Sequence, residues 1–150
     1  IVNAAGPSGL LMPLNVQRAR IEGWSLGYAG TLGRTTLRAD LELLDPRNES
    51  TGRQLQRRAR RQLTLGADHA VGPWRFGGSL LAVGHRFDDT ANTRRLGGYT
   101  TLDLYTDWQF ARDLALQLRL NNLADKRYET AFGYNQPGRA LYATLRWQPK

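Results

Sequence analysis

The sequence predicts an all-β protein whose antiparallel strands form a segment of a transmembrane β-barrel. First, apolar and polar residues alternate at a period of two along nearly the whole chain, whereas helical spacing is nowhere sustained. Second, the connections between strands alternate between short and long, as in outer-membrane barrels with short periplasmic turns and long extracellular loops. Third, aromatic residues gather near one end of the predicted strands.

The alternation predicts seven strands, at residues 18–30, 35–45, 58–71, 74–87, 98–110, 114–121 and 139–148. The stretch LALQLRLN at residues 114–121 shows it best, because leucine fills every second position from Leu114 and Gln117, Arg119 and Asn121 lie between. Since neighbouring side chains of a strand point to opposite faces, one face would contact lipid and the other a hydrated lumen. A mean hydropathy of −0.52 fits this arrangement, since half of each strand never meets lipid.

The connections between these strands differ in length. Tight turns are predicted near residues 31–33, 72–73 and 111–113, and long loops at residues 46–57, 88–97 and 124–138. Residues 6–16 would form another long loop if residues 1–5 end an earlier strand. Short and long connections therefore lie at opposite ends of the sheet, with the short ones on the periplasmic side.

Six aromatic residues on the predicted apolar faces lie near the short-turn end: Tyr28, Trp74, Phe76, Trp108, Phe110 and Trp147. Aromatic rings favour the border between lipid and water, so these six are expected to form a girdle at the membrane interface. The alternative is that they are core residues of a soluble β-sandwich or a lipocalin-like barrel. The common level of the six rings favours the girdle.

Composition argues against several classes of protein. With no cysteine and only two histidines, neither a disulfide framework nor a thiolate or histidine-rich metal site is expected, and no cofactor is predicted. No apolar run approaches the roughly 18 residues of a membrane-spanning helix. The formal charge of +8 raises nucleic acid as a partner. The densest arginine cluster, within residues 53–61, has no interleaved aromatic residues, so no nucleic-acid partner is predicted.

Two motifs resemble those of a known family. NLADKRYE at residues 122–129, followed by GY at 133–134 and PGR at 137–139, resembles the C-terminal signature of TonB-dependent outer-membrane receptors. LDPRN at residues 44–48 with LQRRA at 55–59 is similar to the cobalamin-transporting branch of that family. The chain ends in WQPK instead of the terminal aromatic residue usual in the family, and Trp147 would take its place.

The resemblance implies active import of a bulky, scarce ligand across the bacterial outer membrane: cobalamin, or alternatively a siderophore or haem. It implies a barrel of about 22 strands, of which residues 1–150 would be the C-terminal portion, without the N-terminal plug through which such receptors engage TonB. Ligand contacts are expected in the extracellular loops, at Arg47, Asn48, Arg57, Tyr128 and Tyr134. Outer-membrane lipid and lipopolysaccharide are the further partners expected, with the arginines at residues 57–61 as candidates for an anionic group.

Other functions are less favoured. An enzyme in a small barrel would need Ser79 and His85 with Asp88 or Asp89, but Ser79 and His85 would lie roughly 20 Å apart along a strand, too far for a triad, so no enzyme is predicted. A self-contained passive barrel would need residues 1–5 as an eighth strand, because bacterial single-chain barrels have even strand numbers. For Tyr128, Tyr134 and Arg139, loop packing and turn closure are the alternative to ligand contact.

Overall fold

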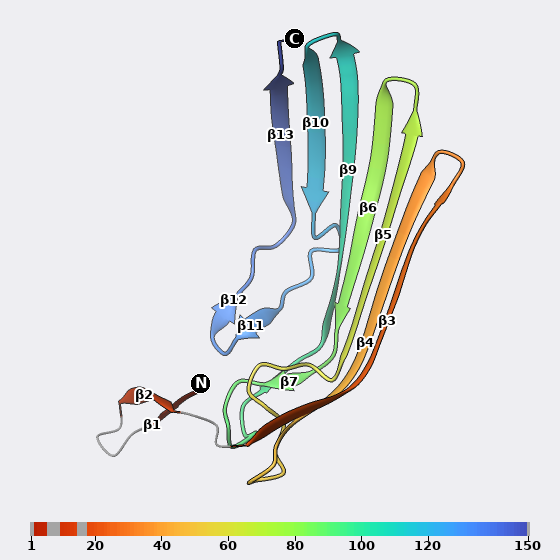
Figure 1. Cartoon of the computed structure of the whole chain (residues 1–150). Helices are drawn as coiled ribbons and strands as arrows, with labels where there is room; N and C mark the ends of the chain where they lie inside the picture. Colours follow the sequence, from red (N-terminus) through yellow and green to blue (C-terminus); the bar gives the residue numbers. More distant parts are fainter. Residues whose placement is uncertain (1, 6–9, 15–17, 150) are drawn as a thin grey trace.

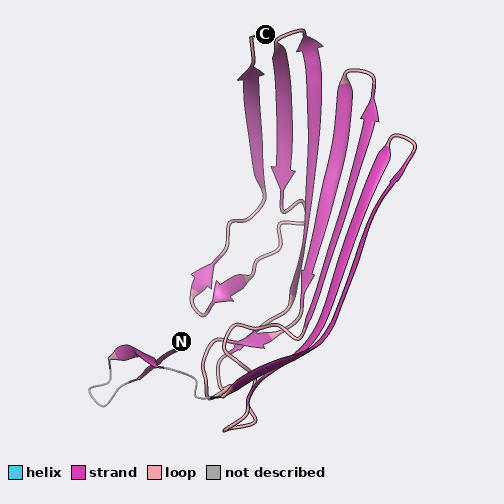
Figure 2. Cartoon of the chain, in the orientation of Figure 1, coloured by secondary structure: helices cyan, strands magenta, loops and turns pink. Residues whose placement is uncertain are grey.

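The computed structural model describes residues 2–5, 10–14 and 18–149. Its main feature is a seven-stranded antiparallel sheet in which the strands follow one another in space as they do along the chain (Figure 1). The strands are β3 (Ala19–Leu32), β4 (Thr35–Asn48), β5 (Arg61–Val71), β6 (Trp74–Val83), β9 (Tyr99–Ala111), β10 (Leu114–Asn121) and β13 (Ala140–Trp147). The described part of the chain folds into strands and loops (Figure 2), and no helix there is long and apolar enough to cross a membrane. The predicted all-β class is confirmed.

The seven predicted strands are confirmed, with corrections at three of their ends. β4 continues to Asn48 instead of ending before Pro46, because Pro46 needs no N–H partner and still pairs with Ile21. β5 begins at Arg61, three residues later than expected. β6 ends at Val83, and the residues expected to extend it form the separate short strand β7 (Arg86–Phe87), which pairs with β8 (Arg95–Leu96).

At the N-terminus the described residues 2–5 form a strand, as the prediction required, but its partner differs from the expected one. β1 (Val2–Ala5) pairs with β2 (Leu11–Leu14) in a sheet of their own, so residues 2–5 do not join the seven-stranded sheet. The residues of β2, expected in a loop, form a strand. The rest of the expected strand and loop, at residues 1, 6–9 and 15–16, lies outside the described residues. A self-contained passive barrel would need residues 1–5 as an eighth strand of the main sheet, and the pairing of β1 with β2 does not supply that strand.

Short and long connections lie at opposite ends of the sheet, as predicted (Figure 1). The turns that join β3 to β4, β5 to β6 and β9 to β10 lie at the end that also holds the C-terminus. Gly33 and Gly72 take φ values of +61° and +54° in two of these turns, a region that favours glycine. The long loops at the other end contain β7, β8 and the small sheet of β11 (Glu129–Ala131) and β12 (Tyr134–Asn135).

One face of the sheet is apolar from edge to edge. The register places Leu26 opposite Leu41, and Leu41 opposite Leu63, across three neighbouring strands. At the other edge Leu116 of β10 lies opposite Leu145 of β13. The alternation that predicted each strand separately therefore brings all the apolar sides onto one surface, because the strands pair in register.

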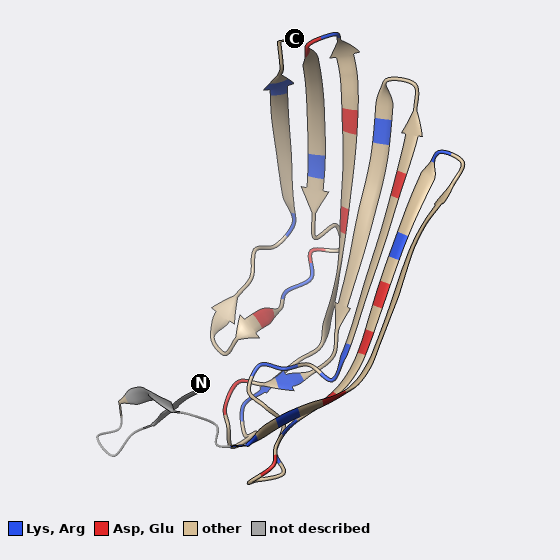
Figure 3. Cartoon of the chain, in the orientation of Figure 1, with Lys and Arg blue, Asp and Glu red and all other residues tan. Residues whose placement is uncertain are grey.

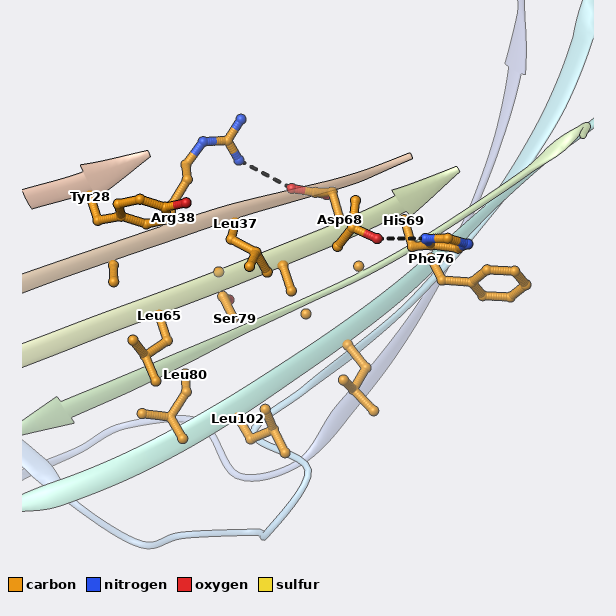
Figure 4. Close-up of a pocket in the computed structure, with 17 residues that line it drawn as sticks. Tyr28, Leu37, Arg38, Leu65, Asp68, His69, Phe76, Ser79, Leu80 and Leu102 are labelled. Atoms are coloured by element: carbon orange, nitrogen blue, oxygen red, sulfur yellow. Dashed lines mark hydrogen bonds and ion pairs between the residues drawn. The ribbon is translucent and has the colours of Figure 1, made fainter. Parts of the chain in front are cut away.

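The apolar face is exposed. Leu26 is 59% and Leu145 65% exposed, so these leucines do not pack against a second protein layer. A shallow groove of about 680 Å³ lies on this face. Figure 4 shows that Leu65, Leu80 and Leu102, which line it, lie on the opposite side of the strands from Arg38. An apolar surface this continuous indicates contact with lipid or another protein, because it would be unstable in water.

The opposite face carries the charged side chains of the central strands, which are joined in pairs across neighbouring strands. Arg38 Nη1 donates to Asp68 Oδ2 at 3.1 Å, and the Tyr105 hydroxyl also donates to the Asp68 carboxylate. Gln117 Nε2 donates to Asp107 Oδ1 at 2.9 Å. This polar face is therefore suited to water, where such pairs stay hydrated.

Gly77 provides a test of the polar face, because the Tyr105 ring lies directly over it. A Cβ atom at Gly77 would overlap this ring. We expect Gly77→Ala to displace Tyr105 from Asp68 and to lower the free energy of unfolding by about 1–3 kcal/mol. Gly66→Ala is the matched control, since its Cβ would meet nothing nearer than Arg38 Cβ at 3.9 Å. Urea unfolding of the full-length protein in detergent measures both, and equal losses would contradict the prediction.

Candidate functional site

The three long loops form a single interlocked cap at one end of the sheet. We call residues 49–60 loop A, residues 84–98 loop B and residues 122–139 loop C. Pro46, near the end of β4, is fully buried, and Leu96 of loop B is only 2% exposed. The buried side chains at this end thus lie beneath the loops, while the apolar strand face remains uncovered.

Loops A and B are joined by a reciprocal pair of hydrogen bonds. The Gln54 N–H donates to Asn92 Oδ1 at 2.8 Å, and Asn92 Nδ2 donates to the Gln54 carbonyl at 2.9 Å. Asn92 has a φ of +57°, which asparagine tolerates better than most residues. Arg57 Nε also donates to Asp88 Oδ1 at 2.5 Å, and the Arg57 N–H donates to the Phe87 carbonyl at 2.7 Å. These contacts hold loop A in one position relative to loop B.

Loops B and C are joined by a buried arginine and a pair of stacked tyrosines. Arg86 is 4% exposed, and its Nη2 donates to the Glu129 carbonyl at 2.8 Å. Its guanidinium lies 5.4 Å from the centre of the Tyr99 ring, and that ring stacks on Tyr128 at 4.0 Å. Burial is the main cause that raises the pKa of the Tyr128 phenol, and Tyr99 and Asp103 add to it. Sequence reasoning missed Arg86, because a lone arginine after a strand gives no sign of burial.

The segment that carries the C-terminal signature closes loop C upon itself. Asn122, 5% exposed with φ +49°, donates from Nδ2 to the carbonyls of Lys126 and Pro137, and its Oδ1 accepts from the Lys126 N–H at 2.9 Å. Asp125 Oδ1 accepts from the Arg139 N–H at 2.8 Å. The asparagine and aspartate of this motif therefore hold both ends of the loop, which gives the motif a structural role.

The five predicted ligand contacts differ in their surroundings. Arg47 is exposed, and its Nε lies 2.6 Å from Asp45 Oδ2. Asn48 Oδ1 accepts from the Ser50 N–H at 3.0 Å and so shapes the start of loop A. Arg57 and Tyr128 hold loops together through the contacts described above, and Tyr134 on β12 is 71% exposed. The structure thus brings Arg57 and Tyr128 into the cap and leaves the Tyr134 ring open.

The six rings predicted to form a girdle lie toward the short-turn end of the sheet. Trp74 and Trp108 are cross-strand partners with ring centres 5.0 Å apart and nearly parallel planes. Phe76 lies 5.9 Å from Trp74, and Phe110 lies 5.3 Å from Trp108. Tyr28 and Trp147 lie on the same apolar face near the two edges of the sheet, on β3 and β13, and are 61% and 69% exposed. The rings could therefore meet a membrane border together, and that role remains a proposal.

The two aspartates considered for catalysis are engaged in loop contacts. Asp88 pairs with Arg57, and Asp89 accepts from Thr93 Oγ1 and from the N–H groups of Thr93 and Arg94. Burial alone would raise the pKa of Asp89, but the hydrogen bonds from Arg94 and Thr93 outweigh it and lower that pKa. Asp89 thus serves as a loop cap, an ionised acceptor for a turn.

Known proteins resemble this chain in both sequence and structure. A family model described as TonB dependent receptor-like, beta-barrel matches residues 1–123. Two relatives are each named Vitamin B12 transporter BtuB. The one from Photobacterium profundum is 30% identical over 146 residues, which cover 97% of this chain and 24% of the relative. The one from Vibrio vulnificus is 34% identical over 150 residues, which cover 95% and 24%.

Solved structures share the fold. The siderophore receptor PiuA from Acinetobacter baumannii matches with a TM-score of 0.79 at 22% identity, over 86% of this chain and 22% of that one. The sheet, with one uncovered apolar face and one charged face, is thus a wall segment of a transmembrane β-barrel. The chain belongs to the TonB-dependent receptor β-barrel family, whose members are outer-membrane proteins. It spans about a quarter of the length of the relatives named above. The predicted family and location are confirmed.

Proposed function

We propose that the protein containing this sequence takes up cobalamin across the outer membrane in a TonB-dependent manner. The observation that carries the proposal is the 30–34% identity to two vitamin B12 transporters over nearly the entire chain. The LDPRN motif at residues 44–48, which resembles the cobalamin branch, supports it. The siderophore receptor is only 22% identical and therefore supports the fold alone.

In this proposal the chain supplies part of the barrel wall, toward the C-terminal side, and three loops at the outer mouth. Antiparallel pairing along β3 to β13 gives the wall, and the polar face lines the lumen, where a plug would lie. Loops A, B and C form the rim. Because they are cross-linked by Asn92 and Arg86, they would present a preformed surface to a bulky ligand, which limits the entropy lost on binding.

The contacts that we propose are an open aromatic ring on loop C and a half-exposed cation on loop A. Tyr134 offers an exposed ring at the tip of loop C, and Arg57 is half exposed, with its side chain 51% accessible. Asn48 and Tyr128 would position the loops, through the hydrogen bond of Asn48 to Ser50 and the stacking of Tyr128 on Tyr99. Arg47 lies instead on the outward side of β4, where it can contact the membrane surface.

The test is ligand binding to the full-length protein in detergent, measured calorimetrically with cyanocobalamin and, separately, with a ferric siderophore. We expect cyanocobalamin to bind and Tyr134→Ala to weaken its binding about tenfold, the loss of one central aromatic contact. Tyr28→Ala is the control, since Tyr28 is similarly exposed but lies on the outward face. Binding of the siderophore without cobalamin would contradict the proposal and favour the alternative within the family.

A further inference from the structure

The positive charge of the chain is concentrated at the long-loop end. Residues 18–20, 45–61, 84–98 and 122–139 contain fourteen Lys or Arg and six Asp or Glu, which accounts for the whole net charge of +8. The rest of the chain is balanced. Figure 3 shows the blue segments crowding the loops and the strand ends beside them. A charge asymmetry of this kind attracts an anionic partner to one membrane surface.

Part of this charge lies on the outward side of the sheet, between the apolar face and the long loops. The register that puts Trp24 opposite Leu43 on that face continues toward the long loops, so that Glu22 pairs with Asp45 and Arg20 with Arg47. Arg61 pairs with Leu43 from the other neighbouring strand. At this level the outward surface changes from apolar to charged side chains within one pair of residues, as expected at a membrane border.

A pocket of about 720 Å³ lies at this border. Trp24 and Leu43 line its apolar part. Its charged part is lined by three arginines and two carboxylates: Arg47, Arg60, Arg61, Glu22 and Asp45. Gly23 makes room in its wall, because the backbone of β3 there approaches the Leu43 carbonyl too closely for any Cβ atom. Trp24 is 74% exposed, although a tryptophan of a water-soluble surface would normally be covered.

The charges of the pocket do not cancel. Asp45 lies between two guanidinium groups, 2.6 Å from Arg47 Nε and 3.6 Å from Arg60 Nη2, so one carboxylate serves two cations. Arg61 has no carboxylate within salt-bridge distance among the described residues. Arg20 is matched by Glu22, and more distantly by Glu49 at 4.0 Å. A surplus of guanidinium groups beside an apolar surface fits a ligand that carries phosphate and hydrocarbon together.

We propose that this pocket binds the lipid A portion of lipopolysaccharide, whose headgroup carries phosphates and whose acyl chains run into the membrane. The phosphates contact Arg47, Arg60 and Arg61, and an acyl chain lies along Trp24 and Leu43. The pocket faces away from the lumen, so this site is separate from the loops that would contact a transported ligand. Because the binding concerns the wall itself, it does not depend on what the receptor imports.

The experiment compares the amount of lipid A bound by the full-length protein in detergent, measured by native mass spectrometry. Arg61→Gln is expected to lower the retention of bisphosphorylated lipid A about tenfold, the loss of one charge-assisted contact. Trp24→Ala is expected to lower it as well. The controls are Arg112→Gln, at a tight turn of the opposite end, and Trp147→Ala, which is 69% exposed compared with 74% for Trp24.

Two further measurements complete the test. Lipid A without phosphates loses the contacts to all three arginines, so it should bind the unaltered protein more weakly than bisphosphorylated lipid A binds Arg61→Gln. Phosphatidylglycerol should bind the unaltered protein more weakly than bisphosphorylated lipid A does. Arg61→Lys, which keeps the charge, should retain part of the binding and guards against a folding defect, and heat-modifiability on gels checks folding of every variant. Equal retention in Arg61→Gln and Arg112→Gln, or equal binding of phosphatidylglycerol and lipid A, would overturn the proposal.

Discussion

Leu118→Arg should reduce the free energy of unfolding of the membrane-inserted protein by about 2–4 kcal/mol, the cost of an arginine facing lipid near the middle of a barrel strand. Leu118 lies in the interior of β10, opposite Thr106 on one side and Ala143 on the other, and is 40% exposed on the apolar face. The arginine would have no carboxylate partner there, because the charged side chains of the central strands point the other way.

The matched control is Gln117→Arg, which places the same side chain one residue away on the same strand. Gln117 lies opposite Asp107 and donates to it, so an arginine there gains a partner on the hydrated face. We expect a change of less than about 1 kcal/mol, as for an exposed ion pair. Urea titration of the protein folded into phospholipid vesicles measures both variants. If the two substitutions cost the same, the apolar face does not contact lipid.

Asn122→Ala should destabilise loop C by about 3–5 kcal/mol, because it removes three side-chain hydrogen bonds from a buried site and puts alanine in a left-handed conformation. The N–H of Lys126 and the carbonyls of Lys126 and Pro137 would lose their partner. Hydrogen exchange of residues 122–139, followed by mass spectrometry in the full-length protein, should show faster exchange confined to this loop.

Asn121→Ala is the control for this prediction. Asn121 is the neighbouring asparagine, but it lies at the end of β10 and only accepts one hydrogen bond, from Arg119 Nε at 2.7 Å. Its loss should leave exchange in loop C unchanged within about twofold, as for a polar group that water can replace. Similar exchange in the two variants would mean that Asn122 does not close the loop.

The strands could be predicted from the sequence because alternation is a local signal. In β10 and β13, whether a residue is apolar or polar indicates which face of the sheet it lies on. The order of short and long connections predicts a sheet in which consecutive strands are neighbours. The ends were less predictable, since Pro46 reads as a loop residue but pairs within β4, and Arg86 reads as part of β6 but pairs with Leu96. Strand ends depend on loop contacts between distant residues.

The sequence by itself determined which side of each strand is apolar, where the tight turns lie and, through its motifs, the family. Only the tertiary structure decided that Asn92 and Arg86 lock the three loops together, and that Arg61 and Trp24 share one pocket. The physical reason is the separation along the chain of the residues involved. Alternation concerns neighbouring residues and can be read locally. A hydrogen bond between Gln54 and Asn92, or a pocket that spans three strands, depends on the strand register, which is established only when the whole sheet assembles.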